Sequence, residues 1–241
     1  MSGHSKWAQI KRQKGVADQK KGALFTKLGK AIALAARKGG ADPDMNVQLR
    51  LAVDKAKSYN MPASTIERAI SRASGADQED KQISEVLYEG YGPGGVAILI
   101  EATTDNRNRT SATIRQLLSA SGGKLAAAKS VQWMFGRRGV ILVTTQADRD
   151  AQELALIDAG ADDLKPTDEG LVVEVEPDAL LAVRKRLEES GQHVAYAQIE
   201  FVPTTMVDAL APADAEKLQR LIESLEDDPD VNTVATNDSH A

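Results

Sequence analysis

The sequence predicts an α+β protein in which an N-terminal three-helix basic bundle precedes two α/β domains, with the third domain inserted into the second. Three observations predict this fold. Residues 1–75 and 76–241 carry opposite charge, the first part repeats apolar residues at helical spacing, and the second part alternates short apolar strands with helices. We expect domains at 1–75, at 82–136 joined with 203–237, and at 137–202.

The charge difference is large. Residues 1–75 hold 15 Lys and Arg against five Asp and Glu, whereas residues 76–241 hold 15 against 30. No acidic residue precedes Asp18. A basic module attached to an acidic body is the electrostatic pattern expected of a protein that binds a polyanion such as DNA or RNA.

The basic part is predicted to be helical. Between Lys20 and Lys38, apolar residues fall on one face of a helix and cations on another, with Leu34 intruding on the basic face. Gly39-Gly40 ends this helix, and Asp42-Pro43-Asp44 supplies caps for a second helix over 44–59. A capping box over 64–67 opens a third helix that extends to about residue 73.

After residue 81 the pattern predicts a mixture of strands and helices. Strands are expected over 83–89, 96–103, 130–135, 139–144, 161–165, 170–176, 193–201, 204–210 and 231–235, and helices over 106–121, 148–159, 178–190 and 213–225. Residues 137–202 form a β-α-β-β-α-β-like run that can close a small domain. The piece after residue 203 is too short to fold alone, so we expect it to join the sheet that begins at Ile83.

Composition limits the class of protein and its compartment. Hydrophobic residues make up 42% and charged residues 27% of the chain, as in ordinary globular proteins, and cysteine is absent. No apolar run approaches the roughly 18 residues that span a bilayer, and the N-terminal segment lacks the apolar core of a secretory signal. We therefore expect a cytoplasmic protein with no membrane partner, and a monomer.

No pattern of catalytic residues is present. The segment Gly90 to Gly95 satisfies the glycine spacing of a dinucleotide-binding loop, but a strand follows it instead of a helix, so a tight turn is the better interpretation. His4, His193 and His240 are too dispersed for a metal cluster. We expect no catalytic residue, no metal, no cofactor and no small-molecule substrate.

The candidate nucleic-acid-binding residues are basic or lie beside basic residues. They are His4, Lys6, Trp7, Lys11, Arg12, Lys14, Lys20, Lys21, Lys27, Lys30, Arg37, Lys38, Arg107 and Arg109. A charged helix face is ordinarily only solvated, but a solvating surface mixes both signs, which favours phosphate binding here. At 105–110 an anion site at a helix start and a simple helix cap stay equally open. Trp7 can stack on a base or tether the N-terminal arm.

Several segments resemble the YebC/PmpR family. They are Gly3-His4-Ser5-Lys6-Trp7, Phe25-Thr26-Lys27-Leu28, residues 49–56, Asn60-Met61-Pro62 with residues 66–70, Tyr88-Glu89-Gly90-Tyr91-Gly92-Pro93-Gly94-Gly95, residues 104–110 and Val131-Gln132-Trp133-Met134-Phe135. The resemblance runs from residue 3 to about residue 232. It implies a bacterial cytoplasmic protein with a helical bundle and two α/β domains, described as a DNA-binding transcriptional regulator.

Related members of that family act in translation, including the mitochondrial translational activator of cytochrome c oxidase subunit I. Two departures from the family pattern stand out. The family usually has a glycine in the loop before Ser130-Val131, where this chain has Ala126-Ala127-Ala128-Lys129. Residues 234–237 lack the aromatic residue usually found there. The first departure bears on any contact that needs a flexible glycine loop.

We therefore expect a non-enzymatic, nucleic-acid-binding regulator of gene expression, of the DNA-binding transcriptional type. An RNA-binding or ribosome-associated translation factor is the alternative, because phosphate contacts carry affinity without identifying the polymer. A second alternative is a protein-interaction adaptor whose basic bundle docks on its own acidic domains. Salt-dependent binding to DNA or RNA discriminates against the adaptor.

Overall fold

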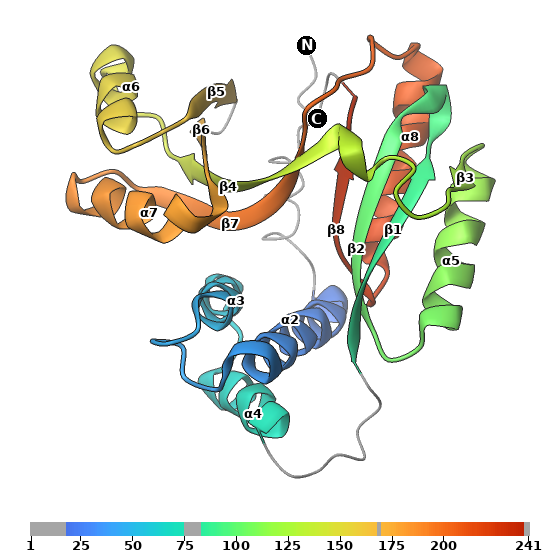
Figure 1. The fold of residues 1–241 in the computed structure, drawn as a ribbon, viewed down its shortest axis with the longest axis horizontal. Coiled ribbons are helices and arrows are strands. Elements are labelled where there is room, and N and C mark those ends of the chain that lie inside the picture. Colours follow the sequence, from blue (N-terminus) through green and yellow to red (C-terminus); the bar gives the residue numbers. More distant parts are fainter. Residues whose placement is uncertain (1–17, 75–82, 168–169, 239–241) are drawn as a thin grey trace.

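The computed structural model describes residues 18–74, 83–167 and 170–238. These residues form a helical module and two antiparallel sheets, each sheet covered by helices on one face (Figure 1). The predicted fold class, α+β with the third domain inserted into the second, is confirmed. The two sheet-containing domains lie side by side above the helical module in Figure 1.

The helical module consists of α2 (Asp18–Gly39), α3 (Val47–Ser58) and α4 (Ala63–Ser74). Leu28 and Ile32 of α2, Leu49 of α3 and Ile66 of α4 are buried together in one apolar cluster. Gly40, whose φ is 92°, lets the chain leave α2 in the left-handed region. The module therefore has its own small core, as the spacing of apolar residues predicts.

Asn46 decides where α3 begins. Its Oδ1 accepts a hydrogen bond from the backbone N–H of Leu49 at 3.1 Å, and its Nδ2 donates to the carbonyls of Ala35 and Gly40, each at 2.8 Å. The cap thus lies at residue 46, later than the Asp42–Asp44 caps that the sequence suggests. A buried amide with three partners fixes the end of α2 against the start of α3.

The first sheet has the strand order β3-β1-β2-β8 and combines strands from both ends of the α/β region. Its elements are β1 (Ser84–Tyr91), η1 (Pro93–Gly95), β2 (Ala97–Thr104), α5 (Arg107–Ala120), β3 (Lys124–Leu125), η2 (Gln132–Met134), α8 (Pro212–Asp227) and β8 (Val231–Thr236). Ile98 and Ile100 pack against α5 and α8, whereas Leu99 points to the opposite face and packs near Phe135.

The second sheet has the strand order β5-β6-β4-β7 and lies entirely within residues 135–203. Its elements are β4 (Phe135–Val143), α6 (Arg149–Asp158), β5 (Asp163–Thr167), β6 (Gly170–Val175), η3 (Pro177–Ala179), α7 (Leu180–Glu189) and β7 (Val194–Pro203). Strands β4 and β7 pair from Phe135–Pro203 onward and carry the chain into and out of this domain (Figure 1).

Two predicted strands differ in the structure. Residues 204–210 form no strand and have only an isolated bridge between Val207 and Asp238. Residues 132–134 form a 3₁₀ turn, and the strand predicted from residue 130 begins instead at Phe135. In both places a short apolar run predicts a strand, but the segment connects other elements instead. Its conformation follows from packing against those elements and not from local periodicity.

Candidate nucleic-acid interface

The structure describes only part of the candidate binding residues. His4, Lys6, Trp7, Lys11, Arg12 and Lys14 lie outside the described residues, and for Lys20 and Lys21 only the backbone in α2 is described. The side chains that can be placed are those of Lys27, Lys30, Arg37 and Lys38 on α2, and Arg107 and Arg109 on α5.

Lys30 and Arg109, from two different domains, converge on one buried carboxylate. Asp230 lies between α8 and β8, and its side chain is 4% exposed. Lys30 Nζ lies 2.6 Å from Oδ1 of Asp230, and Arg109 Nη2 lies 2.6 Å from Oδ2. The hydroxyl of Thr110 donates to the same Oδ2 at 2.7 Å. We call these four residues the Asp230 node.

The node sets the charge state of its carboxylate. Burial by itself raises the pKa of Asp230, but hydrogen bonds from Arg109, Lys30 and Thr110 outweigh burial and hold that pKa well below its usual value. Asp230 is therefore ionised at neutral pH and offsets two cations that the sequence assigns to phosphate binding.

Lys27 contacts the end of helix α8. Its ammonium group donates to the carbonyl of Glu226, and the carboxylates of Glu226, Asp228 and Asp227 lie near it. A cation is favoured at a helix C-terminus, where the backbone carbonyls point outward. Burial nevertheless dominates and lowers the pKa of Lys27 to about 8.

The helical module also touches the first sheet through Lys38 and the second sheet through α3. Lys38 pairs with Glu85 of β1. Arg184 of α7 pairs with Asp54 at 2.8 Å, and Leu51 of α3 is buried with apolar residues of the second sheet. Lys27, Lys30 and Lys38 are thus held against the acidic domains by contacts within the chain.

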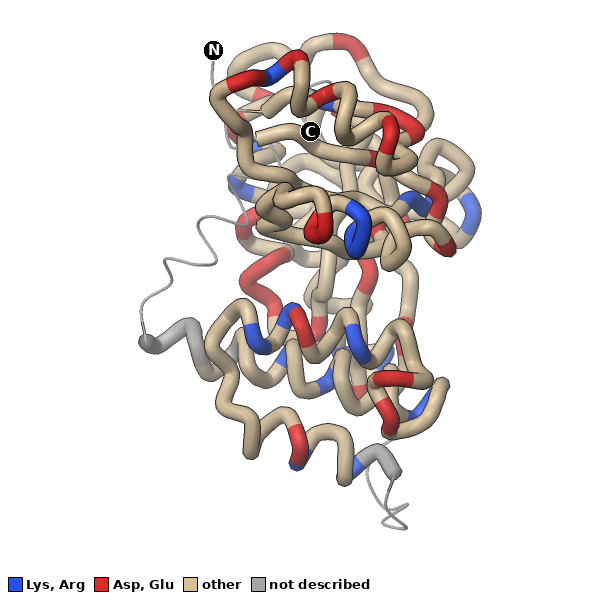
Figure 2. The backbone as a smooth tube through the Cα atoms, turned by 90° about the vertical axis from the view of Figure 1, so that its left-hand side faces the viewer, with Lys and Arg blue, Asp and Glu red and all other residues tan. Residues whose placement is uncertain are grey.

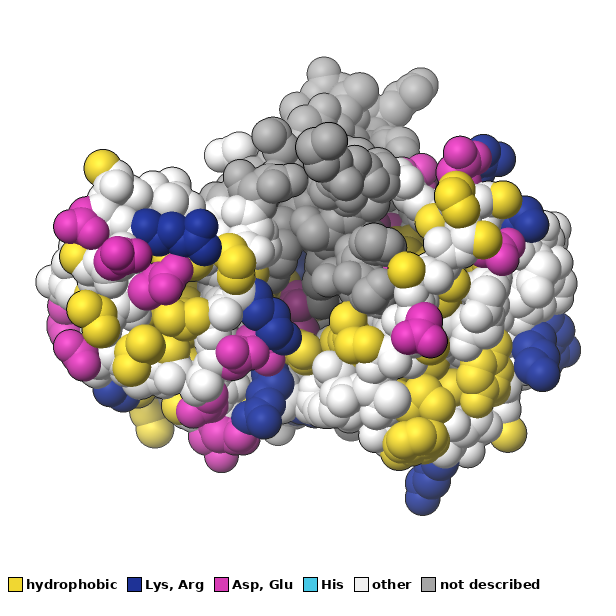
Figure 3. All heavy atoms as spheres, turned by 90° about the horizontal axis from the view of Figure 1, so that it is seen from above, with side chains coloured by type: hydrophobic (Ala, Val, Ile, Leu, Met, Phe, Trp, Pro, Cys, Tyr) yellow, Lys and Arg dark blue, Asp and Glu magenta, His cyan; other side chains and the backbone are white. Residues whose placement is uncertain are grey.

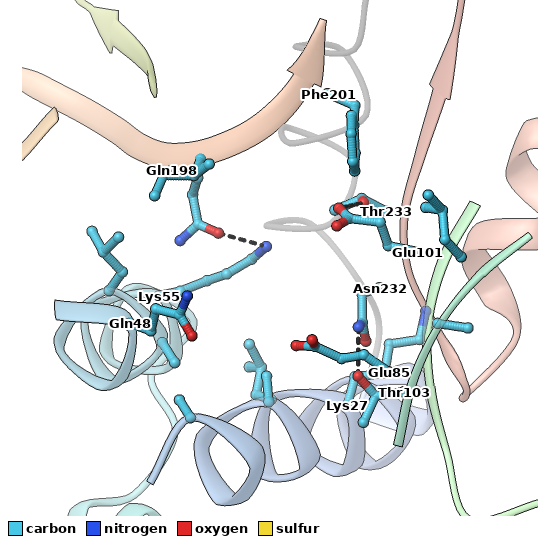
Figure 4. A pocket seen from close by; sticks show the side chains of 18 of the residues that line it. Lys27, Gln48, Lys55, Glu85, Glu101, Thr103, Gln198, Phe201, Asn232 and Thr233 are labelled. Carbon is cyan, nitrogen blue, oxygen red and sulfur yellow. Dashed lines mark hydrogen bonds between the residues drawn. The ribbon is translucent and has the colours of Figure 1, made fainter. Parts of the chain in front are cut away.

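A cleft of about 1170 Å³ lies where the module meets both sheets (Figure 4). Lys55 reaches across it to Gln198, with 3.3 Å between Nζ and Oε1, and Asn232 donates to Thr103 on the opposite wall at 2.7 Å. Its charged lining residues are Lys27, Lys38, Lys55, Arg137, Glu85, Glu101, Glu223, Glu226 and Asp227. Because both signs line it, the cleft is not a cationic surface.

The start of α5 is a capped helix end. Asn106 accepts a hydrogen bond from the backbone N–H of Arg109 at 3.1 Å. Arg107 is exposed, and its Nε donates to the hydroxyl of Ser84 at 3.2 Å. Arg109 also pairs with Asp105 at 2.9 Å. Of the two hypotheses for residues 105–110, an anion site and a helix cap, these contacts show the cap.

A different set of cations lies between α2 and α4. Arg37, Arg68 and Arg72 have exposed side chains and line a groove of about 300 Å³. Among the described residues, none of these three arginines forms an ion pair with a carboxylate. Sequence reasoning selected only Arg37. The signal that identifies the others is their i,i+4 spacing, which places Arg68 and Arg72 on one face of a helix.

The domain of the second sheet carries charges of both signs and does not extend this cationic surface. Figure 3 shows acidic and basic side chains interspersed over the lobe formed by β4–β7, α6 and α7. Several cations there pair with acidic neighbours on the same helix, including Arg149 with Glu153 and Arg184 with Glu188, both at 2.9 Å. In Figure 2 the helical module forms a separate layer below the two sheet-containing domains.

Other classes of site find no support within the described part of the chain. No group of His, Asp and Glu there could hold a metal ion. The glycine-rich segment forms the turn η1, with Gly94 and Gly95 at φ values of 68° and 78°, and strand β2 follows it. Among the described helices, none is both long and apolar enough to cross a membrane.

Comparisons with known proteins agree with this architecture. Residues 5–76 match the TACO1/YebC protein N-terminal domain, and residues 83–238 match the TACO1/YebC second and third domain. The chain belongs to the TACO1/YebC family. A relative from Moorella thermoacetica is 49% identical over 98% of this chain and 95% of its own, and one from Lactiplantibacillus plantarum is 44% identical over 97% of both chains.

Both of these TACO1/YebC relatives are named "Probable transcriptional regulatory protein". Among solved structures, a conserved hypothetical protein from Aquifex aeolicus superposes with a TM-score of 0.85 and 38% identity. The superposition covers 92% of this chain and 91% of that one. The family predicted from the sequence is thereby confirmed, and the names support a regulatory role.

Proposed function

We infer that this protein is a non-enzymatic regulator of gene expression that binds nucleic acid through its helical module. The observation that carries the proposal is the separation of charge. Residues 1–75 hold three times as many cations as anions, and in the structure residues 18–74 form a layer of their own. The names of the relatives supply independent support for regulation.

Contacts within the chain divide the cations of α2 into two sets. Lys27, Lys30 and Lys38 contact the first sheet domain, and they hold the module in place. Arg37 is exposed and faces the groove with Arg68 and Arg72. The proposed interface is therefore the α2–α4 side of the module.

The test is a titration of the full chain with labelled duplex DNA and with labelled RNA at several salt concentrations. The expected result is binding that weakens steeply as salt rises, with a log–log slope of about −0.9 per duplex phosphate neutralised or about −0.7 per single-strand phosphate. Absence of binding to either polymer at low salt would contradict the proposal.

The adaptor hypothesis remains the second candidate because a specific observation favours it. The Asp230 node and the Lys27 contact join the basic module to the acidic α/β domains, as an adaptor with internal docking requires. The same titration separates the two candidates, because an adaptor with its cations offset internally has no salt-dependent affinity for nucleic acid. Comparison of the affinity for DNA with the affinity for RNA separates the transcriptional from the translational alternative.

A further inference from the structure

The groove between α2 and α4 combines cations with apolar surface. Arg37, Arg68 and Arg72 stand at its rim, whereas Phe25, Met61 and Ala69 lie among its lining residues. Gly29 on α2 faces Met61, so that a Cβ built at Gly29 would lie 3.9 Å from Cε of Met61. The small residues Gly29, Ala33 and Ala69 line the groove and leave a hollow beside the arginines.

Helix dipoles explain only part of this arrangement. Arg37 and Arg72 belong to the last turns of α2 and α4, where a cation stabilises the helix end. Arg68 lies one turn earlier in α4 and gains little from the dipole. Of the described residues that line the groove, none is acidic, although α4 carries Glu67 next to Arg68. Among the described residues, Lys30 also lines the hollow but pairs with Asp230, whereas the three arginines form no ion pair with a carboxylate.

We propose that this groove is a binding site for single-stranded RNA, in which Arg37, Arg68 and Arg72 contact consecutive phosphates and an unpaired base packs on the apolar lining. The proposal rests on the function inferred above and assigns it a place and a ligand. A guanidinium group binds a phosphate with two parallel hydrogen bonds, so three arginines along one groove suit a phosphodiester chain.

The apolar lining decides between a single strand and a duplex. In a duplex the bases are stacked inside and cannot reach the partly buried ring of Phe25, so only a strand with unpaired bases uses both parts of the groove. The hydroxyl groups of Thr26 and Thr65 also line it. A hydroxyl can bind the ribose 2′-hydroxyl, which DNA lacks, and this favours RNA over single-stranded DNA.

The experiment uses the full chain and a variant in which Arg37, Arg68 and Arg72 are all replaced by Gln. Fluorescence anisotropy measures the affinity for a short labelled oligouridylate at several salt concentrations, with oligodeoxyuridylate and duplex DNA in parallel. Loss of three single-strand phosphate contacts is expected to reduce the magnitude of the log–log salt slope by about 2. Affinity for the oligouridylate should fall more than affinity for the duplex.

The matched control replaces Arg115, Arg149 and Arg220 by Gln, which removes the same charge from exposed helix positions on the other two domains. This control is expected to keep the salt slope of the parent. The Arg→Lys version of the groove variant should recover most of the slope, because it keeps the charge. If the triple Gln variant loses its cooperative melting transition, the single variant Arg68→Gln is measured instead. It is expected to reduce the magnitude of the log–log salt slope by about 0.7.

The outcomes separate this inference from the proposed function. If the parent protein binds the oligouridylate and the groove variant binds it equally well, the groove site is overturned and the proposed function stands. A larger loss for duplex DNA than for oligouridylate overturns the choice of single-stranded RNA, as does equal loss for the oligodeoxyuridylate. A parent that binds none of the three probes overturns both proposals.

Discussion

Lys30 and Asp230 are 200 positions apart in the chain, yet Nζ of Lys30 lies 2.6 Å from Oδ1 of Asp230. The carboxylate is almost fully buried, and Arg109 and Thr110 bind its other oxygen. This contact joins the N-terminal helical module to the segment that enters the last strand. The position of the module relative to the first sheet therefore depends on a residue near the opposite end of the chain.

Asp230→Asn is expected to lower the free energy of unfolding by about 2 kcal/mol at neutral pH, because it replaces charge-assisted hydrogen bonds with weaker ones. The folded-state pKa of Asp230 is held below its usual value, so this stabilisation is present above about pH 4 and is lost as the pH falls further. Denaturant titrations from neutral to acid pH measure it. Glu216→Gln, in an exposed pair with Arg220, is the control and should change stability little.

Lys27→Met tests the buried ammonium group at the end of α8. The unfolded chain keeps this proton up to a pKa of 10.5, whereas the folded protein releases it at about 8. Between these values the unfolded state binds more protons, so stability of the parent rises with pH relative to the variant. The unfolding free energy of the parent minus that of the variant should therefore rise across this window, whereas parallel curves would contradict the buried position. Lys57→Met, at an exposed site on α3, serves as control.

Lys129→Gly should stabilise the protein slightly. Lys129 has a φ of 67°, in the left-handed region that costs a side-chain-bearing residue about 1–2 kcal/mol, and it stands in the loop where the family usually has a glycine. The larger entropy of glycine in the unfolded chain offsets part of the gain, so we expect a rise of less than about 1 kcal/mol. Lys129→Ala keeps the Cβ and should show no gain in thermal melts. An equal gain in both variants would assign the effect to charge.

Removal of residues 137–202 should leave a folded protein. Phe135 and Pro203 are paired neighbours on β4 and β7, so a short turn can join Gly136 to Pro203 without moving the first sheet. Truncation after Val202 removes α8 and β8, and it should instead expose β2 and cause aggregation. Size-exclusion chromatography and thermal melts compare the two proteins. A soluble truncated protein with a sharp transition for the first sheet would contradict these domain limits.

The sequence predicts the elements of this fold well where a single periodicity governs a segment. In α2, buried Leu28 and Ile32 and exposed Arg37 lie on the faces that helical spacing predicts. In β2, seven of the eight residues are buried, because the strand has a neighbour on each edge and side chains pack on both of its faces, which suits its continuous apolar run. Residues 204–210 lack such neighbours, and the predicted strand does not form there.

The site was harder to predict for a physical reason. Whether Lys27 or Lys38 is available to a phosphate depends on which acceptor faces it. The backbone carbonyl of Glu226 and the carboxylate of Glu85 are 199 and 47 positions away. No local pattern encodes such pairings. Arg68 and Arg72 could have been found from their helical spacing, but their position opposite Arg37 depends on how α4 crosses α2.

The strand order of the first sheet has a consequence for biosynthesis. Strand β2 lies between β1 and β8, so its second edge stays unpaired until Val231–Thr236 have been synthesised. At about 5–20 residues per second, translation from Thr104 to Val231 takes on the order of ten seconds. During that interval the inserted sheet can complete itself, whereas β2, with seven of its eight residues buried in the finished fold, waits with an open edge. An open edge of an apolar strand can pair with other chains, so we expect the nascent chain to be most prone to aggregation before its last strand has left the ribosome.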